Sequence, residues 1–199
     1  MSEGLIINLA FEDPLHEAVL RKIFSQLGFS VGRCFSHGGS GYLKTKIKGF
    51  NHAARVTPFL VLTDLDRIDC APILISDWLP FTRHPNLLFR VAVREIESWV
   101  LAHREAFAKY LGVTQNKIPL NVDEVIDPKQ FLTNLARTSK YRSIREAIVP
   151  RPGSSAKQGP DYNGTLAAFV NDHWDANIAA LNSPSLMKMI NALVSFKPI

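Results

Sequence analysis

The sequence predicts an α/β fold, with a mainly parallel four-stranded sheet between helices and a helical extension at the carboxyl end. First, the continuous apolar run at residues 59–62 is typical of a strand that is covered on both faces. Second, strand and helix signals alternate up to Gly112, which implies crossovers between parallel strands. Third, strand signals vanish beyond Gly112. We therefore divide the chain into an α/β domain, residues 1–112, and a helical extension, residues 113–199, that packs on it.

The first half of the α/β domain reads as strand, helix, strand, helix. Asp13 and Pro14 make a helix start, with the aspartate as N-cap and the proline at the first helical position. Apolar residues then recur every four positions until Gly28, which marks the helix end. The expected strands are residues 4–11 and 29–35, and the expected helices are Pro14–Leu27 and residues 42–55.

The second half repeats this order around the central strand. A short helix is expected over residues 70–79, a fourth strand over 87–93, and one long helix over 95–111. In the extension, Asp127 and Ser183 each precede a proline, so both are expected to begin a helix. Residues 149–164 are rich in proline, glycine, serine and lysine, and we expect a loop there.

The composition is that of an ordinary globular protein. Of 199 residues, 46% are hydrophobic and 21% are charged, and the formal net charge is +5. No apolar run approaches the roughly 18 residues that a membrane span needs, and no signal peptide is evident, so we expect a cytoplasmic protein without a membrane partner. Cys34 and Cys70 are too few for a structural zinc site, and we expect both to be buried.

Basic residues gather in two runs, one before the central strand and one in the extension. The first run is Lys44, Lys46, Lys48 and Arg55; the second is Arg137, Lys140, Arg142, Arg145, Arg151 and Lys157. Either run could contact the phosphate backbone of a nucleic acid. Each could equally be the solvated face of a helix.

Three of the four expected strands end in acidic residues. Glu12 follows the first strand, Asp64 and Asp66 follow the third, and Glu95 follows the fourth. Open parallel sheets bind ligands beyond the carboxyl ends of their strands, so these four carboxylates are expected to line one crevice. In an extended chain, Asp64 and Asp66 project to the same side and can converge on one point. Alternatively, one of them caps the next helix and the other is a solvated turn residue.

These residue types suggest a metal site. Asp64 and Asp66 would bind one or two Mg²⁺ or Mn²⁺ ions and leave positions open for phosphate oxygens. Glu12 would be a further ligand, or the general acid or base for phosphodiester cleavage or transfer. The alternative for Glu12 is a purely structural interaction with the dipole of the helix that follows it.

Further candidates flank these acids. Arg94, Lys44 or Lys46 could neutralise the charge that builds on a phosphate in the transition state, although Arg94 could instead pair with a neighbouring acid. Glu95 and Glu97 lie two residues apart and cannot both point inward if the helix has already begun there. We therefore favour Glu95 as the catalytic carboxylate, with Glu97 as its substitute.

Several motifs resemble an uncharacterised bacterial family of Toprim-like proteins. They are EDPLHEAVL at residues 12–20, LTDLD at 62–66 with CAP at 70–72, and REIESW at 94–99. GPDYN at 159–163, Trp174 and SPSL at 183–186 also resemble that family, so the similarity covers nearly the whole chain.

The resemblance implies the Toprim fold of topoisomerases, primases and several nucleases. It also implies a Mg²⁺-dependent site at Glu12, Asp64 and Asp66, without an established substrate. In one respect the chain departs from the pattern, because Asp13 stands where Toprim enzymes usually have a glycine that lets the backbone approach a phosphate. The additional negative charge could bind a metal or hinder the phosphate.

We therefore expect metal-dependent phosphodiester chemistry on nucleic acid, most simply by a nuclease; a bacterial defence or repair assembly is implied by the resemblance alone. The alternative is a non-catalytic binding or regulatory module, with a vestigial acidic site and an extension that docks on a partner such as an ATPase. Phosphatases of the haloacid-dehalogenase type also end a buried strand in Asp-x-Asp, but they place it near the chain start and add a later acidic pair. The six histidines show no metal-ligand spacing.

Overall fold

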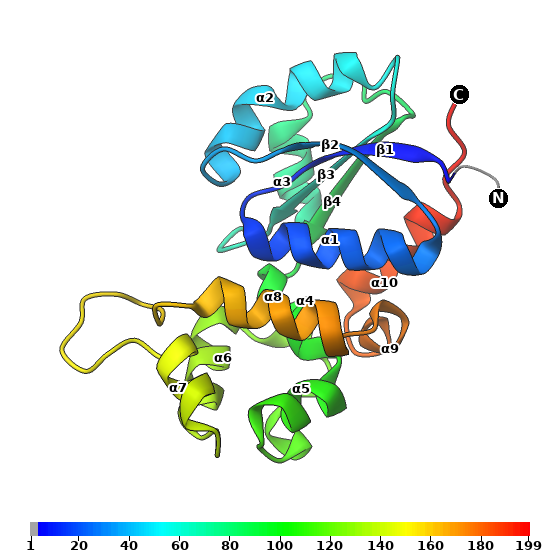
Figure 1. Cartoon of the computed structure of the whole chain (residues 1–199). Coiled ribbons are helices and arrows are strands. Elements are labelled where there is room, and N and C mark those ends of the chain that lie inside the picture. The colour runs from blue at the N-terminus through cyan, green and yellow to red at the C-terminus, as the bar shows by residue number, and fades with distance from the viewer. Residues whose placement is uncertain (1–3) are drawn as a thin grey trace.

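A four-stranded sheet flanked by helices is the centre of the computed structural model, which describes residues 4–199 (Figure 1). The strands are β1, Ile6–Ala10; β2, Ser30–Phe35; β3, Phe59–Asp64; and β4, Leu87–Ala92. Their order is β2-β1-β3-β4, and every neighbouring pair is parallel. The prediction of an α/β fold with a parallel sheet between helices is therefore confirmed.

The strand order creates a switch point between β1 and β3. From β1 the chain moves outward to β2 and then returns to place β3 on the other side of β1. Ala10 of β1 lies in register with Val61 of β3, so Glu12 lies level with Thr63 at the carboxyl ends of these inner strands. Crevices at such points are where open α/β sheets bind ligands.

The apolar run in β3 contributes to two cores because successive side chains of a strand point to opposite faces. Leu60 and Leu62 belong to the larger core, which includes the buried face of α1, Pro14–Leu27. Phe59 and Val61 belong to the second core. The helices that close this second core are α2, Ser40–Ala53, and α3, Ala71–Trp78.

Helix α1 begins and ends at the predicted residues. Oδ1 of Asp13 accepts hydrogen bonds from the backbone N–H groups of Leu15 and His16, which satisfies two amides of the first turn. Gly28 closes the helix with φ of 77°, in the left-handed region that glycine adopts without strain.

The prediction of one long helix at residues 95–111 is wrong. The structure has α4, Ile96–Ala102, and α5, Arg104–Leu111, with His103 between them at φ −80° and ψ 64°. Nδ1 of His103 accepts a hydrogen bond from the backbone N–H of Asp175, at 3.0 Å. This contact with the distant extension stabilises the break, and no glycine or proline marks it in the sequence.

The extension packs against the sheet domain. It contains α6, Pro128–Arg137; α7, Arg142–Ile148; α8, Tyr162–His173; α9, Ala176–Ala180; and α10, Pro184–Val194, with short 3₁₀ turns at Gln115–Lys117 and Val122–Glu124. Figure 1 shows α8 beside α1, and α10 lies against β4 and α9. Side chains of α8 and α10 belong to the same core as α1, while the domain boundary at residue 112 stays a prediction.

Two further expectations concern exposure. Cys34 and Cys70 are both exposed free thiols, so the prediction that they are buried is wrong. Both lie near element ends, Cys34 on the outer strand β2 and Cys70 at the N-cap of α3.

Within residues 4–199, no helix has the length and apolar character that crossing a bilayer requires. The cytoplasmic location stays a prediction.

Candidate metal centre

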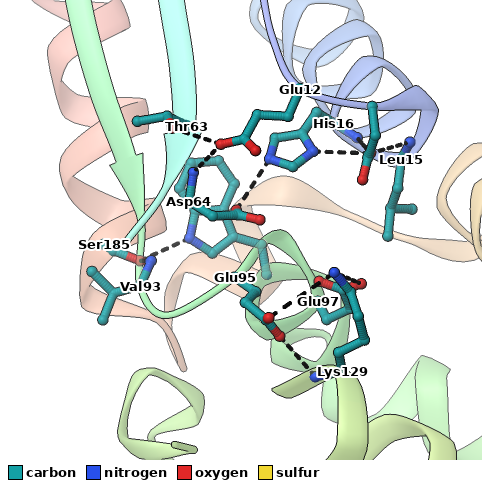
Figure 2. A network of polar contacts seen from close by, with 12 residues as sticks. Glu12, Leu15, His16, Thr63, Asp64, Val93, Glu95, Glu97, Lys129 and Ser185 are labelled. Atoms are coloured by element: carbon teal, nitrogen blue, oxygen red, sulfur yellow. Dashed lines mark hydrogen bonds and ion pairs between the residues drawn. The ribbon is translucent and has the colours of Figure 1, made fainter. Parts of the chain in front are cut away.

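Glu12 lies two residues beyond the end of β1 and reaches across to β3 (Figure 2). Its Oε1 accepts a hydrogen bond from the Thr63 hydroxyl at 2.6 Å and another from the backbone N–H of Asp64 at 2.9 Å. Burial and the neighbouring Asp64 carboxylate raise the pKa of Glu12, although these hydrogen bonds oppose the shift. The register of the two inner strands thus holds the Glu12 carboxylate beside the Asp64 backbone.

His16 lies in the first turn of α1 and is fully buried. Its Nδ1 is 2.9 Å from Oδ1 of Asp13, and its Nε2 is 3.1 Å from Oδ1 of Asp64. An ionised carboxylate only accepts hydrogen bonds, so when Asp13 and Asp64 are both ionised, both ring nitrogens donate and the ring is an imidazolium. Burial lowers the pKa of His16, but the Asp64 charge and the hydrogen bonds to both carboxylates raise it by more, so the pKa lies well above its usual range.

Asp13 combines helix capping with support of His16. Burial raises the pKa of Asp13, but the hydrogen bond and charge of His16, together with two backbone N–H groups, lower it to about 2. Asp13 is therefore ionised at neutral pH. Its carboxylate fixes the orientation of the His16 ring from the side opposite Asp64.

Glu12, His16 and Asp64 bring one potential ligand atom each within 4.8 Å of one another. In the part of the chain that the structure describes, theirs is the one group of three or more acidic, histidine or cysteine side chains with this proximity. Glu12 and Asp64 were predicted from the sequence but His16 was not, because the histidines show no ligand spacing among themselves. The available signal was a histidine on the buried face of a helix that begins directly after an acid.

Asp66 lies outside this group. The strand ends at Asp64, and Asp66 has φ of 50°, so the chain is no longer extended between them, and Asp66 is not one of the three residues that bring ligand atoms together. Asp66 instead lines a hollow of about 170 Å³ together with Glu95 and Lys129. Burial and the Asp64 charge raise the pKa of Asp66.

Lys129, from α6 of the extension, lies between Glu95 and Glu97. Its Nζ is 3.5 Å from Oε1 of Glu97 and 4.0 Å from Oε1 of Glu95, and its backbone N–H donates to Oε2 of Glu95 at 3.0 Å. Helix α4 begins at Ile96, so Glu95 precedes it with an extended backbone. Two residues that lie two positions apart within a helix cannot both point inward, but this restriction does not apply to Glu95 and Glu97, because Glu95 lies outside the helix. Both glutamates face the same lysine.

Glu97 is the most deeply buried of these acids, with 1% of its surface exposed. The Tyr162 hydroxyl donates to its Oε1 at 3.2 Å, while its Oε2 has no hydrogen-bond partner in the described structure. Burial raises the pKa of Glu97 to about 7, with contributions from Asp64 and Glu95, while Lys129 opposes the shift. The carboxyl group therefore changes its charge near neutral pH.

The basic side chains that the sequence suggested lie elsewhere. Arg94 donates from Nη1 to the backbone carbonyls of Ile68, at 2.6 Å, and Asp66, at 3.4 Å, so it holds the loop after β3. Lys46 is exposed on α2, and Lys44 pairs with Asp77 at 2.7 Å. Lys129 is the ammonium group that the structure brings to the acids, and no sequence argument had singled it out.

Comparisons of the chain with protein-family models, curated proteins and solved structures gave no match. The resemblance to Toprim-like proteins therefore stays a prediction that depends on its motifs. A function for this chain must consequently be inferred from the site itself, an acid–histidine–acid group at the switch point of a parallel sheet.

Proposed function

We propose that this protein catalyses Mg²⁺- or Mn²⁺-dependent phosphodiester cleavage in nucleic acid, at the group formed by Glu12, His16 and Asp64. The observation that supports this most is the proximity of three potential ligand atoms at the carboxyl ends of the two inner strands. Toprim-like identity and a role in bacterial defence or repair are parts of the same proposal, and they depend on the sequence motifs.

The donor set suits a divalent cation. Oε2 of Glu12 and Oδ2 of Asp64 accept no hydrogen bond from residues 4–199, so both oxygens remain available as ligands. Carboxylate oxygens suit Mg²⁺ and Mn²⁺, and an imidazole nitrogen is a further possible ligand for Mn²⁺. Nε2 of His16 would serve once it has lost its proton, with Nδ1 still donating to Asp13 as metal-bound histidines usually do. When bound, the metal would supply Lewis acidity toward a phosphate oxygen.

Other side chains have roles that do not involve the metal. If Glu12 does not bind the metal, its raised pKa suits it to hold or accept a proton near the scissile bond. Lys129 stays charged, because the attraction of Glu97 and Glu95 outweighs burial and raises its pKa. Its ammonium group would neutralise phosphate charge in the role that the sequence had assigned to Arg94 or Lys46. Asp66 and Glu95 would face the substrate from the adjoining hollow.

A second candidate function is a binding or regulatory module whose acidic site is vestigial. The observation that favours it is internal charge compensation: His16 pairs with Asp13 and Asp64, and Lys129 pairs with Glu95 and Glu97. These cations can balance the acids without a metal. An ATPase partner for such a module stays a prediction.

Nuclease assays with Mn²⁺ and Mg²⁺ on single- and double-stranded DNA and RNA test the proposal. We expect cleavage by the native protein and a cleavage rate that is lower by about 100-fold or more in Asp64→Asn, because that change replaces the carboxylate ligand by a neutral amide of the same size. Asp77→Asn, at an exposed position on α3, is the matched control and should cleave normally. Calorimetry with Mn²⁺ gives a second readout. If the native protein neither binds Mn²⁺ nor cleaves any substrate, the module is the better description.

A further inference from the structure

We infer that a basic groove between α6, α7 and the 149–160 segment binds a single strand of nucleic acid along its phosphate backbone and leads it to the acidic site. Only the last part, delivery to the site, rests on the proposed function. Figure 1 shows the 149–160 segment as a long loop that extends away from α6 and α7.

The groove consists of three adjoining hollows. The hollow of about 170 Å³ that contains Asp66 and Glu95 also reaches Gln130 and Lys157. These last two residues line a second hollow, of about 520 Å³. The second hollow shares Arg137 and residues 149–152 with a third, of about 670 Å³. Shared walls make one path from the acids along α6 to α7.

The far part of this path is positively charged. Arg137, Arg151 and Lys157 are exposed and form no ion pair with residues 4–199. Glu146 is the one acid that lines the second or third hollow, and Arg142 already pairs with it at 2.7 Å. The three unpaired cations therefore present their charge to whatever occupies the groove, and they suit a chain of phosphates.

The spacing along α6 connects this charge to the site. Lys129 and Arg137 lie eight residues apart on the same helix, which corresponds to about 12 Å along its axis. A strand that kept the B-DNA rise of about 3.4 Å per nucleotide would span this interval with roughly three to four nucleotides, and a more extended strand would span it with fewer. A strand held at Arg137 can therefore extend to the hollow of Asp66 and Glu95.

The lining favours recognition of a backbone. None of the side chains that line the second and third hollows is aromatic, so this part of the chain offers no surface for base stacking. One wall is the 149–152 segment itself, which narrows the groove. A hollow of about 670 Å³ corresponds to a width of roughly 9 Å if it is equally wide in all directions, which is narrower than the major groove of a double helix alone, about 12 Å, so we infer that one strand occupies it.

Fluorescence anisotropy tests the groove without any cleavage. The probe is a fluorescein-labelled DNA strand of about 20 nucleotides in EDTA, at several salt concentrations. We expect the triple variant Arg137→Ala, Arg151→Ala, Lys157→Ala to bind about tenfold more weakly or worse and to lose about two units of salt slope, at about 0.7 per phosphate contact. All three side chains are exposed, so the variant should keep the native melting temperature.

The matched control is Arg33→Ala, Arg83→Ala, Lys197→Ala, which removes the same charges from exposed positions on β2, between α3 and β4, and after α10. It should bind within about threefold of the native protein. An equal loss in both variants would mean that net charge alone attracts the strand, and the groove would be rejected. Tighter binding of a duplex of the same sequence would overturn the single-strand assignment.

Cleavage assays separate the two proposals. A groove variant that loses binding, in a protein that never cleaves with Mn²⁺, supports the groove and contradicts the nuclease. Normal binding by the triple variant rejects the groove, even if the native protein cleaves and depends on Asp64.

Discussion

The most informative perturbation is Glu97→Gln, because Glu97 is a buried acid whose charge changes near neutral pH. Its carboxyl group contacts Lys129 and Tyr162, and glutamine keeps the size and one acceptor oxygen. The expected effect is on the pH dependence of stability, so it can be measured without knowing the substrate. EDTA keeps metals out of the experiment.

The sign and size follow from the pKa. The pKa of Glu97 is raised from 4.5 to about 7, so the folded protein binds a proton that the unfolded chain has already released. Stability from this group is complete below about pH 4.5 and is lost as the pH rises toward 7. At about 1.4 kcal/mol per pH unit, the loss is about 3 kcal/mol. The pKa already includes the attraction of Lys129.

Urea unfolding at about pH 5 and about pH 8, followed by tryptophan fluorescence, measures this difference. The free energy of unfolding of Glu97→Gln relative to the native protein should rise by about 3 kcal/mol between the two pH values. The control Glu105→Gln, at an exposed position on α5, should follow the native profile. Parallel profiles of the native protein and Glu97→Gln would refute the reasoning, because they would mean that burial does not shift this group.

Two other changes test the supports of the site. Ser185→Ala removes the hydroxyl that accepts a hydrogen bond from the buried Trp99 indole N–H, at 2.7 Å, and should lower the free energy of unfolding by about 1–3 kcal/mol. The control Ser195→Ala, at an exposed position, should lower it by less. Equal losses in the two variants would contradict this reasoning. Asp13→Ala removes the cap of α1 and the Nδ1 partner of His16, so urea unfolding should show a loss of about 1–2 kcal/mol. If His16 is a ligand, calorimetry should also show about 10-fold weaker Mn²⁺ binding by Asp13→Ala; unchanged affinity would argue against that role.

Local signals explain why so much of the fold was predictable. The Asp13-Pro14 start and the Gly28 end of α1 act through adjacent backbone groups, so the sequence contains all the information. The same holds for β3, whose continuous apolar run reflects burial on both faces. The acids at the carboxyl ends of β1 and β3 were then predicted to lie at the same edge of the sheet, because parallel strands end together.

Long-range contacts explain what was missed. His16 meets Asp64 across 48 positions, and Lys129 meets Glu95 across 34. The break at His103 likewise accompanies a hydrogen bond from Asp175, 72 positions away. Propensity and spacing describe neighbours in the chain, and none of these pairs are neighbours until the fold forms.

The sequence by itself determined the alternation of strands and helices up to β4, the ends of α1 and the delivery of acids to one edge of the sheet. Only the tertiary structure decided which of those acids share a site. It left Asp66 outside the ligand group, brought the buried cation His16 into it, and set Lys129 of the extension against Glu95 and Glu97. The physical reason is that charges in a low-dielectric interior are tolerated only with partners, and packing alone selects those partners.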